Sequence, residues 1–344
     1  SLFEHVPHSR YYGSVDATPL FLLLLWEAYH WTGDLALLQR YLPAAERALG
    51  WIETYGDPDK DGFVEYRRLT RKGLRNQGWK DSWDSVAFND GALAQTPIAL
   101  AEVQGYVYEA RLRMAGIYGL LGDRERQARL GESARRLKQQ FNEAFWMPEA
   151  GYYATALDAR KRQVNSITSN PGHCLWSGIV DAEKAPAVVQ RLMSPEMFSG
   201  WGVRTLSADM TRYHPLSYHN GSVWPHDNSI IAAGLARYGF TREAGRIAMA
   251  ILEAASIFNA NRLPELFAGY PRREYSFPVP YPAANAPQAW ASGALIYLME
   301  TVLGVTPQDG RLTAVTEGET LFRLTGVPYR GKVWDLPGQR AAVS

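Results

Sequence analysis

The 344-residue chain has little cysteine, no long apolar run and almost no excess of charge of either sign. Its single cysteine, Cys174, excludes an internal disulfide framework and favours a reducing compartment, so we expect a cytoplasmic protein. The net charge of +1, with both signs interspersed, gives no reason to expect nucleic acid or an anionic membrane as a partner. The longest apolar run, Pro19–Trp26, is too short to span a bilayer.

Aromatic residues are abundant, at 12% of the chain with 11 tryptophans and 19 tyrosines, so a large core is expected to leave a few of them for a site. The stretch Asn76–Phe88 places Asp81 and Asp84 beside Trp79 and Trp83. Indole rings pack on the apolar C–H faces of sugars, while carboxyl groups exchange protons with hydroxyls and glycosidic oxygens. The stretch therefore indicates carbohydrate chemistry.

A second unusual stretch, Arg262–Tyr270, contains Glu265 between Pro264 and the apolar pair Leu266 and Phe267. Apolar neighbours raise the pKa of a carboxyl group where they bury it. Because Glu265 has no helix of its own to cap, we interpret it as a functional carboxylate.

Most of the chain predicts helical hairpins in which largely apolar and amphipathic members alternate. The first kind is expected over 17–32, 97–121, 173–180, 227–238 and 288–303, the second over 35–55, 124–146, 182–193 and 242–258. This alternation predicts an all-α protein, an (α/α)6 toroid with an inner ring of buried helices inside an outer ring. Six hairpins need twelve helices and nine are predicted, so we expect a toroid that is incomplete at the N-terminus.

We expect two parts in the chain. The toroid forms a catalytic domain over 1–304, and a short, β-rich C-terminal extension follows over 305–344. The runs Thr320–Thr325 and Lys332–Leu336 have the composition of short strands.

The unusual residues gather in segments that precede the apolar helices. These segments are Tyr11–Asp16, Trp79–Asp90, Asn165–His173, Gly200–Trp224 and Pro264–Gln288. Because the inner helices of a toroid run parallel, their N-termini open at one end, so the five segments should surround a single cavity. Helix N-termini also present unpaired N–H groups that favour oxygen-rich ligands.

Structural alternatives remain for several of these residues. Asp16 and Asp227 stand where they could cap helices, with capping the favoured interpretation for Asp227. His219 is as well explained by a structural hydrogen bond as by a ligand contact, and Trp224 before Pro225 is typical of a core residue.

One acidic turn matches the opening of a calcium loop, with Asp57, Asp59, Asp61 and Gly62, but Arg68 stands where the bidentate glutamate belongs. A structural calcium ion is one hypothesis for this turn. An aspartate-rich turn that bonds its own backbone is the more common explanation.

Six motifs occur in the order YYGSVDATPLF, WKDSWDS, SGWGVRTLS, SYHNGSVWPHDN, LPELFAG and APQAW. Together they resemble the bacterial amylo-α-1,6-glucosidase, or glycogen-debranching-like, glycoside hydrolases, which are relatives of trehalases, processing α-glucosidases and mannosylglycerate hydrolases. The resemblance implies an (α/α)6 barrel that hydrolyses O-glycosyl bonds with inversion at the anomeric carbon, without a metal or organic cofactor. It also implies an upstream β-sandwich domain.

The resemblance implies roles for particular residues. The trehalase-like acid motif falls on Asp84, whereas a debranching Trp-x-Asp pattern falls on Asp81, and we prefer Asp84 as the general acid. Glu265 matches the general base. An inverting mechanism needs room for a water molecule, which corresponds to a carboxyl separation of about 6.5–9.5 Å. Substrate contacts are expected at Tyr11, Asp16, Trp79, Trp83, Trp201, Arg204, His219 and Trp224.

The sequence thus favours an α-glucoside hydrolase of debranching type acting on an oligosaccharide or small glycoside. A trehalase-like or mannosylglycerate-hydrolase-like enzyme is the first alternative. The others are a sugar epimerase or isomerase that works through His173, His219 and His226, and a non-catalytic carbohydrate-binding domain.

Overall fold

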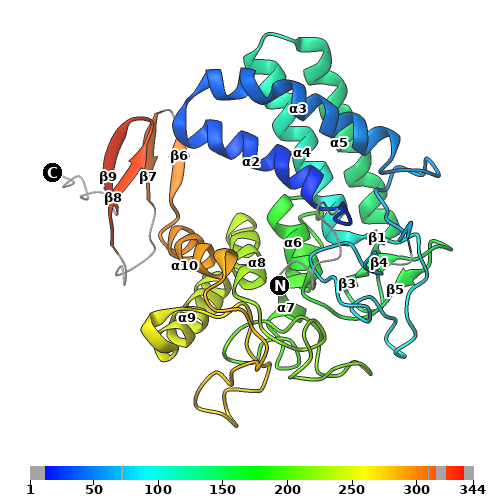
Figure 1. Ribbon diagram of the computed structural model, residues 1–344, viewed down its shortest axis with the longest axis vertical. Helices are drawn as coiled ribbons and strands as arrows, with labels where there is room; N and C mark the ends of the chain where they lie inside the picture. The colour runs from blue at the N-terminus through cyan, green and yellow to red at the C-terminus, as the bar shows by residue number, and fades with distance from the viewer. Residues whose placement is uncertain (1–11, 71–72, 309, 315–322, 337–344) are drawn as a thin grey trace, which may run out of the picture.

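The computed structural model describes residues 12–70, 73–308, 310–314 and 323–336, and it is mostly helical (Figure 1). In this part of the chain there are nine α-helices, arranged in two layers. The inner layer contains α2 (Ala17–Thr32), α4 (Ala101–Leu120), α6 (Asn170–Ser177), α8 (Pro225–Arg237) and α10 (Ala289–Val302). The outer layer contains α3 (Leu35–Thr54), α5 (Arg124–Ala144), α7 (Ala185–Leu192) and α9 (Thr241–Ile257).

The inner helices pack on one another in chain order, from α2 through α4, α6 and α8 to α10, and each of the first four is covered by the outer helix that follows it. This is the alternation that the apolar and amphipathic patterns predict. Local residues set the ends of the elements. Asp34 and Asp123 cap α3 and α5 by accepting hydrogen bonds from Leu37 N and Arg126 N, and α2 ends at Gly33, whose φ of 71° favours glycine.

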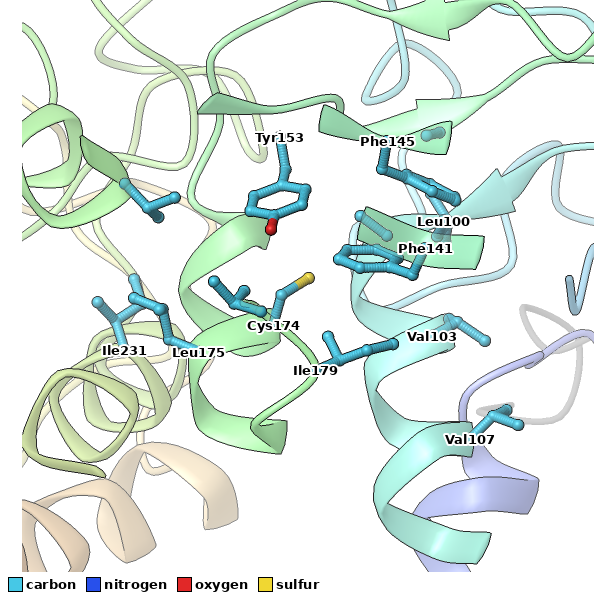
Figure 2. Packing of buried hydrophobic residues seen from close by; sticks show 14 of the residues in the cluster. Leu100, Val103, Val107, Phe141, Phe145, Tyr153, Cys174, Leu175, Ile179 and Ile231 are labelled. Atoms are coloured by element: carbon cyan, nitrogen blue, oxygen red, sulfur yellow. The ribbon is translucent and has the colours of Figure 1, made fainter. Parts of the chain in front are cut away.

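The core lies between the two layers (Figure 2). Val103 and Val107 of α4, Phe141 of α5 and the cysteine Cys174 of α6 belong to one cluster of buried apolar side chains. Burial raises the pKa of the Cys174 thiol well above its usual value, so this residue behaves as a small apolar side chain.

Short antiparallel strands connect the helices. β1 (Ala99–Leu100) pairs with β4 (Ala156–Leu157), which also pairs with β5 (Gln163–Val164), and β2 (Trp146–Met147) pairs with β3 (Tyr152–Tyr153). Because Ala99 and Leu100 belong to a strand, α4 begins four residues later than the predicted start at Pro97. A 3₁₀ turn, η1 (Asn259–Asn261), follows α9.

Two further hairpins follow α10, namely β6 (Thr306–Gln308) with β7 (Arg311–Thr313) and β8 (Leu324–Tyr329) with β9 (Lys332–Leu336). β9 covers the run Lys332–Leu336, whereas half of the run Thr320–Thr325 lies outside the described residues. The second hairpin packs on the end of α2, where the rings of Tyr329 and Trp31 meet edge to face at 5.8 Å.

The described inner helices form an open arc, because α2 and α10 do not pack on each other as neighbouring inner helices do. Both end helices expose apolar side chains, with Leu24 67% and Ile296 56% exposed. The arc is therefore part of the predicted toroid. None of the helices described is both long and apolar enough to cross a membrane.

Candidate active site

A cavity of about 560 Å³ lies at the N-terminal ends of α2, α6, α8 and α10. This volume is typical of small-molecule sites. All five inner helices, or the segments just before them, contribute to its wall. The polar and aromatic lining consists of Ser14, Asp16, Gln77, Trp79, Asp81, Tyr106, His173, His226, Ser229, Trp290 and Tyr297.

Asp81 is a partly buried carboxyl group in this wall. Burial raises its pKa, and the negative charges of Glu265 and Asp16 raise it further. Like charges at one site favour keeping one proton between them. Asp81 therefore has the properties of a general acid.

Glu265, only 5% exposed, is not itself among the residues that line the cavity, but it lies close enough to Asp81 for its charge to act there. One carboxylate oxygen accepts a hydrogen bond from Tyr218 Oη at 2.8 Å, and the other accepts from Asn285 Nδ2 at 3.0 Å. Burial and the Glu265 charge raise the pKa of Tyr218, so the phenol keeps the proton that it donates. These donors fix the orientation of a carboxylate that can accept a proton.

Asp84 and Trp83, the neighbouring candidates, lie elsewhere. Asp84 is not among the residues that line the cavity, and its main-chain oxygen accepts a hydrogen bond from Asn220 Nδ2 at 3.3 Å. The Trp83 side chain is 62% exposed. Our preference for Asp84 over Asp81 as the acid thus finds no support in the geometry.

Trp79 forms an aromatic part of the wall. Its ring lies parallel to His173 at 5.7 Å and meets the edge of His226 at 4.8 Å. Trp224 and His219 are each 1% exposed and stack at 4.9 Å behind this wall. His219 Nδ1 is also 2.9 Å from the Ser82 hydroxyl. The expected sugar contacts at His219 and Trp224 are therefore buried groups that hold the wall.

Trp201 and Arg204 are buried away from the cavity. The Arg204 guanidinium donates to the main-chain oxygens of Gly269, Pro195 and Glu196 at 2.6–3.0 Å. Trp201 Nε1 donates to Tyr275 O at 3.1 Å. Both side chains thus use their polar groups to hold loops. Tyr11, another expected contact, lies outside the described residues.

Asp16 is the N-cap residue of α2, but its side chain accepts no capping hydrogen bond, and Asp227 lies in the first turn of α8 instead of at its N-cap. Asp16 lines the cavity and accepts a hydrogen bond from Ser14 Oγ at 2.5 Å, and burial raises its pKa. The capping interpretation of Asp227 is wrong, because its carboxylate accepts from His173 Nε2 at 2.7 Å instead. Burial alone would raise the pKa of Asp227, but the hydrogen bond with His173 and the positive charge of Lys80 outweigh it and lower the pKa.

Behind Trp79 lies a buried cation, Lys80, which the sequence did not single out. Its ammonium donates to Ser169 Oγ at 3.0 Å, Asn170 Oδ1 at 2.7 Å and Thr205 O at 2.8 Å. Burial lowers the pKa of Lys80 to about 8. All three donors of the ammonium are used, so Lys80 ties the Trp79–Asp81 segment to the start of α6.

The aromatic cavity residues Tyr106 and Trp290 were missed in the sequence, and His226 was a candidate only for the epimerase or isomerase alternative. The His226 and Trp290 rings stack at 3.9 Å, and burial lowers the pKa of His226 to about 3, so its imidazole is neutral. His226 directly precedes Asp227 in the motif SYHNGSVWPHDN, which was the available signal. Tyr106 and Trp290 lie in helical patterns that resemble ordinary core.

The acidic turn contains an internal cation. Lys161 Nζ lies 2.8 Å from Asp59 Oδ2 and 2.6 Å from Asp61 Oδ2. Asp57 accepts hydrogen bonds from the main-chain nitrogens of Asp61 and Gly62. The three aspartates have oxygens within 4.8 Å of one another, as a metal would require, but the lysine ammonium already neutralises two of them.

Comparison with known proteins gives the family of this fold and site. Residues 7–270 match the family model described as the mannosylglycerate hydrolase MGH1-like glycoside hydrolase domain. The mannosylglycerate hydrolase of Rubrobacter radiotolerans is 28% identical over 123 residues, which are 35% of this chain and 28% of that protein. The cytosolic neutral trehalase of Neurospora crassa is 28% identical over 130 residues, which are 36% of this chain and 17% of that protein.

Solved structures show the same fold at low sequence identity. A mannosylglycerate hydrolase from Thermus thermophilus, in complex with Tris and D-glycerate, superposes with a TM-score of 0.62 and 15% identity, covering 85% of this chain and 78% of that chain. A sialidase superposes with a TM-score of 0.69 and 14% identity, covering 90% of this chain and 28% of that chain. The alignments with the curated relatives span less than a third of either relative.

Proposed function

Because the chain belongs to the mannosylglycerate hydrolase MGH1-like family of glycoside hydrolases, we propose that it hydrolyses a small α-glycoside with inversion at the anomeric carbon. Asp81 acts as the general acid and Glu265 as the general base. The observation that supports this assignment is the Asp81 carboxyl in the cavity wall, with a pKa raised by burial and by the nearby charge of Glu265. Two carboxyl groups with different protonation are what inverting glycosidases use.

Each proton has a defined path in this mechanism. Asp81 gives its proton to the glycosidic oxygen as the bond from that oxygen to the anomeric carbon breaks. Glu265 takes a proton from the water that attacks the opposite face of the sugar ring. The products are an alcohol and a free sugar of inverted configuration, and the two carboxyl groups then exchange protons with solvent.

The family and its relatives favour a small substrate over the branch points of a glycogen-like polymer. Among the lining residues that the structure describes, none is a lysine or arginine, while Asp16 and Asp81 are acidic. A neutral leaving group would avoid repulsion from these carboxyl groups. We therefore propose a neutral glycoside such as trehalose ahead of mannosylglycerate, whose glycerate group is anionic.

The test is proton NMR of the anomeric region while the chain acts on trehalose, mannosylglycerate, isomaltose and a limit dextrin. We expect early appearance of the β-anomer from an α-glycoside. Asp81→Asn and Glu265→Gln should each lose at least about a hundredfold in rate. Asp84→Asn is the matched control, because it removes a nearby carboxyl group outside the cavity, and it should keep most of the activity.

The substrate α-D-glucosyl fluoride distinguishes the role of the general acid from that of the general base. Fluoride leaves with little protonation, so Asp81→Asn should lose much less activity on this substrate than on a disaccharide, whereas Glu265→Gln should lose activity on both. An α-anomer as first product would contradict inversion. Loss of activity in Asp84→Asn with retention in Asp81→Asn would return the acid to Asp84, and a single isomerised product would indicate an isomerase.

A further inference from the structure

Tyr106, His173 and Asp227 come from three consecutive inner helices, α4, α6 and α8, and form one chain of hydrogen bonds. Tyr106 Oη lies 2.5 Å from His173 Nδ1, and His173 Nε2 lies 2.7 Å from Asp227 Oδ1. Tyr106 and His173 line the cavity, whereas Asp227 is fully buried behind them. The acid and base assignment leaves these three groups without a role.

The partners fix the direction of the hydrogen bonds. Asp227, with its lowered pKa, is a carboxylate that can only accept, so His173 donates through Nε2–H. When the ring carries only this proton, Nδ1 has a lone pair that accepts a hydrogen bond, and Tyr106 Oη is its partner. Burial, followed by the negative charge of Glu102, raises the pKa of Tyr106 well above its usual value, so the phenol keeps its proton and donates it to His173.

This direction leaves the Tyr106 oxygen with free lone pairs and no proton to offer a ligand. The direction of this hydrogen bond matters for recognition, because an oxygen that can only accept binds a hydroxyl group that donates. The Asp16 carboxyl lines the same cavity, close enough for its charge to raise the pKa of Tyr106, and the Trp79 ring lies parallel to His173. An oxygen acceptor, a carboxyl group and an indole thus line one cavity.

We infer that the Tyr106 oxygen accepts a hydrogen bond from one hydroxyl of the sugar ring bound in the cavity, with His173 and Asp227 as positioning residues that hold the Tyr106 proton away from the substrate. This inference depends on the proposed function, since it concerns the glycosyl group whose bond is cleaved at Asp81 and Glu265. It assigns to Tyr106 the choice of which sugar the enzyme accepts.

The experiment compares α-D-glucosyl fluoride and α-D-mannosyl fluoride with their monodeoxy forms, using fluoride release to obtain kcat/KM. We expect the wild-type chain to reject one monodeoxy form by about ten- to a hundredfold more than Tyr106→Phe does, because phenylalanine has no oxygen for that hydroxyl. The ratios for the other monodeoxy forms should be equal in the two proteins. Tyr152→Phe is the matched control, since it removes a buried phenol that donates to Thr168 O.

Asp227→Asn tests the positioning role. An asparagine amide can donate to His173 Nε2, which would move the imidazole proton to Nδ1 and turn the Tyr106 hydroxyl round. We expect this variant to weaken discrimination against the same monodeoxy sugar as Tyr106→Phe and to leave the other ratios unchanged. Thermal unfolding of each variant separates a general loss of stability from this selective effect.

The inference is overturned if Tyr106→Phe lowers kcat/KM by one factor for every sugar, or changes none of the ratios, in an enzyme that is otherwise active. A wild-type chain that releases neither fluoride nor free sugar from any substrate would instead remove the proposed function, and the inference with it. The two failures are thus distinguishable in the wild-type protein.

Discussion

In the cavity, the charge of Asp16 affects the pKa of Asp81. The negative charge of Asp16 contributes to the raised pKa of Asp81, after burial and Glu265. A general acid works only while protonated, so the basic limb of the pH profile of kcat/KM follows its pKa.

We therefore expect Asp16→Asn to move the basic limb to lower pH, because removing a negative charge lowers the pKa of Asp81. The loss of a substrate contact lowers kcat/KM at every pH, but it does not move the limb. The profile is measured with the best disaccharide from the NMR panel, and Asp84→Asn serves as the control, with a limb at the wild-type position. An unmoved limb in Asp16→Asn would argue against Asp81 as the acid.

Residue identity alone could predict part of the site. Asp16, Asp81 and Glu265 stand out in the sequence because charged groups in apolar surroundings need a reason. Tyr106 and Trp290 do not, because a helical pattern shows only that a side chain is covered and not whether protein or cavity covers it. The opposite error occurred at Trp201 and Arg204, which were predicted to contact the substrate but lie away from the cavity. Aromatic and cationic groups stand out in a sequence, but they also hold loops in place.

At the scale of elements, apolar periodicity predicted the existence of all nine described helices, and the ends shifted where another interaction intervened. Residues 97–100 fit the helical pattern, yet a pairing with β4, far along the chain, takes Ala99 and Leu100 into a strand. The acidic turn is a similar case, because its partner Lys161 lies about a hundred residues away in the sequence. A sequence pattern within one segment cannot predict contacts with residues that are far away in the sequence.

This turn gives a prediction about calcium. Because the Lys161 ammonium lies among the carboxylates of Asp59 and Asp61, we expect calcium to leave the thermal unfolding temperature of the wild-type chain unchanged. Lys161→Asn should lower this temperature without calcium, since like charges then face each other, and regain part of the loss when calcium is added. Asparagine suits the position, where φ is 58°. The measurement is differential scanning calorimetry with calcium or with chelator, and stabilisation of the wild type by calcium would contradict it.

At the scale of the whole molecule, the end helices α2 and α10 of the described arc each have a face that a neighbouring inner helix would cover in a closed ring. Leu24 and Leu25 are neighbours on α2, one 67% and the other 4% exposed. The hydrophobic pattern of α2 treats them alike, because the sequence shows that a helix is apolar and not whether another helix covers each face. The order of helices was predictable, and the width of the gap between α2 and α10 was not.

We expect Leu25→Ala to lower the free energy of unfolding by about 2–5 kcal/mol, because it leaves a cavity in the core. Leu24→Ala should change it by less than about 0.5 kcal/mol, as exposed positions usually do. Urea unfolding followed by circular dichroism measures both. Ile296→Ala and Leu298→Ala, 56% and 0% exposed in the wild type, form a second pair on α10. Equal costs within a pair would show that the exposed face is packed in solution, for example against a second copy.

The open arc also has a mechanical consequence. Both of its end helices line the cavity, through Leu20 of α2 and Tyr297 of α10. In the described part of the chain they are linked through the row of contacts from α2 by way of α4, α6 and α8 to α10, and at the far end of α2 through the hairpin of β8 and β9. Small rotations in the same sense at each helix contact add up along the row, so they move α2 relative to α10 more than they move any two neighbouring helices. The distance between α2 and α10 across the cavity therefore depends on the packing angles of all the inner helices between them. A substitution deep between α4 and α6 can change the fit of the substrate without touching it.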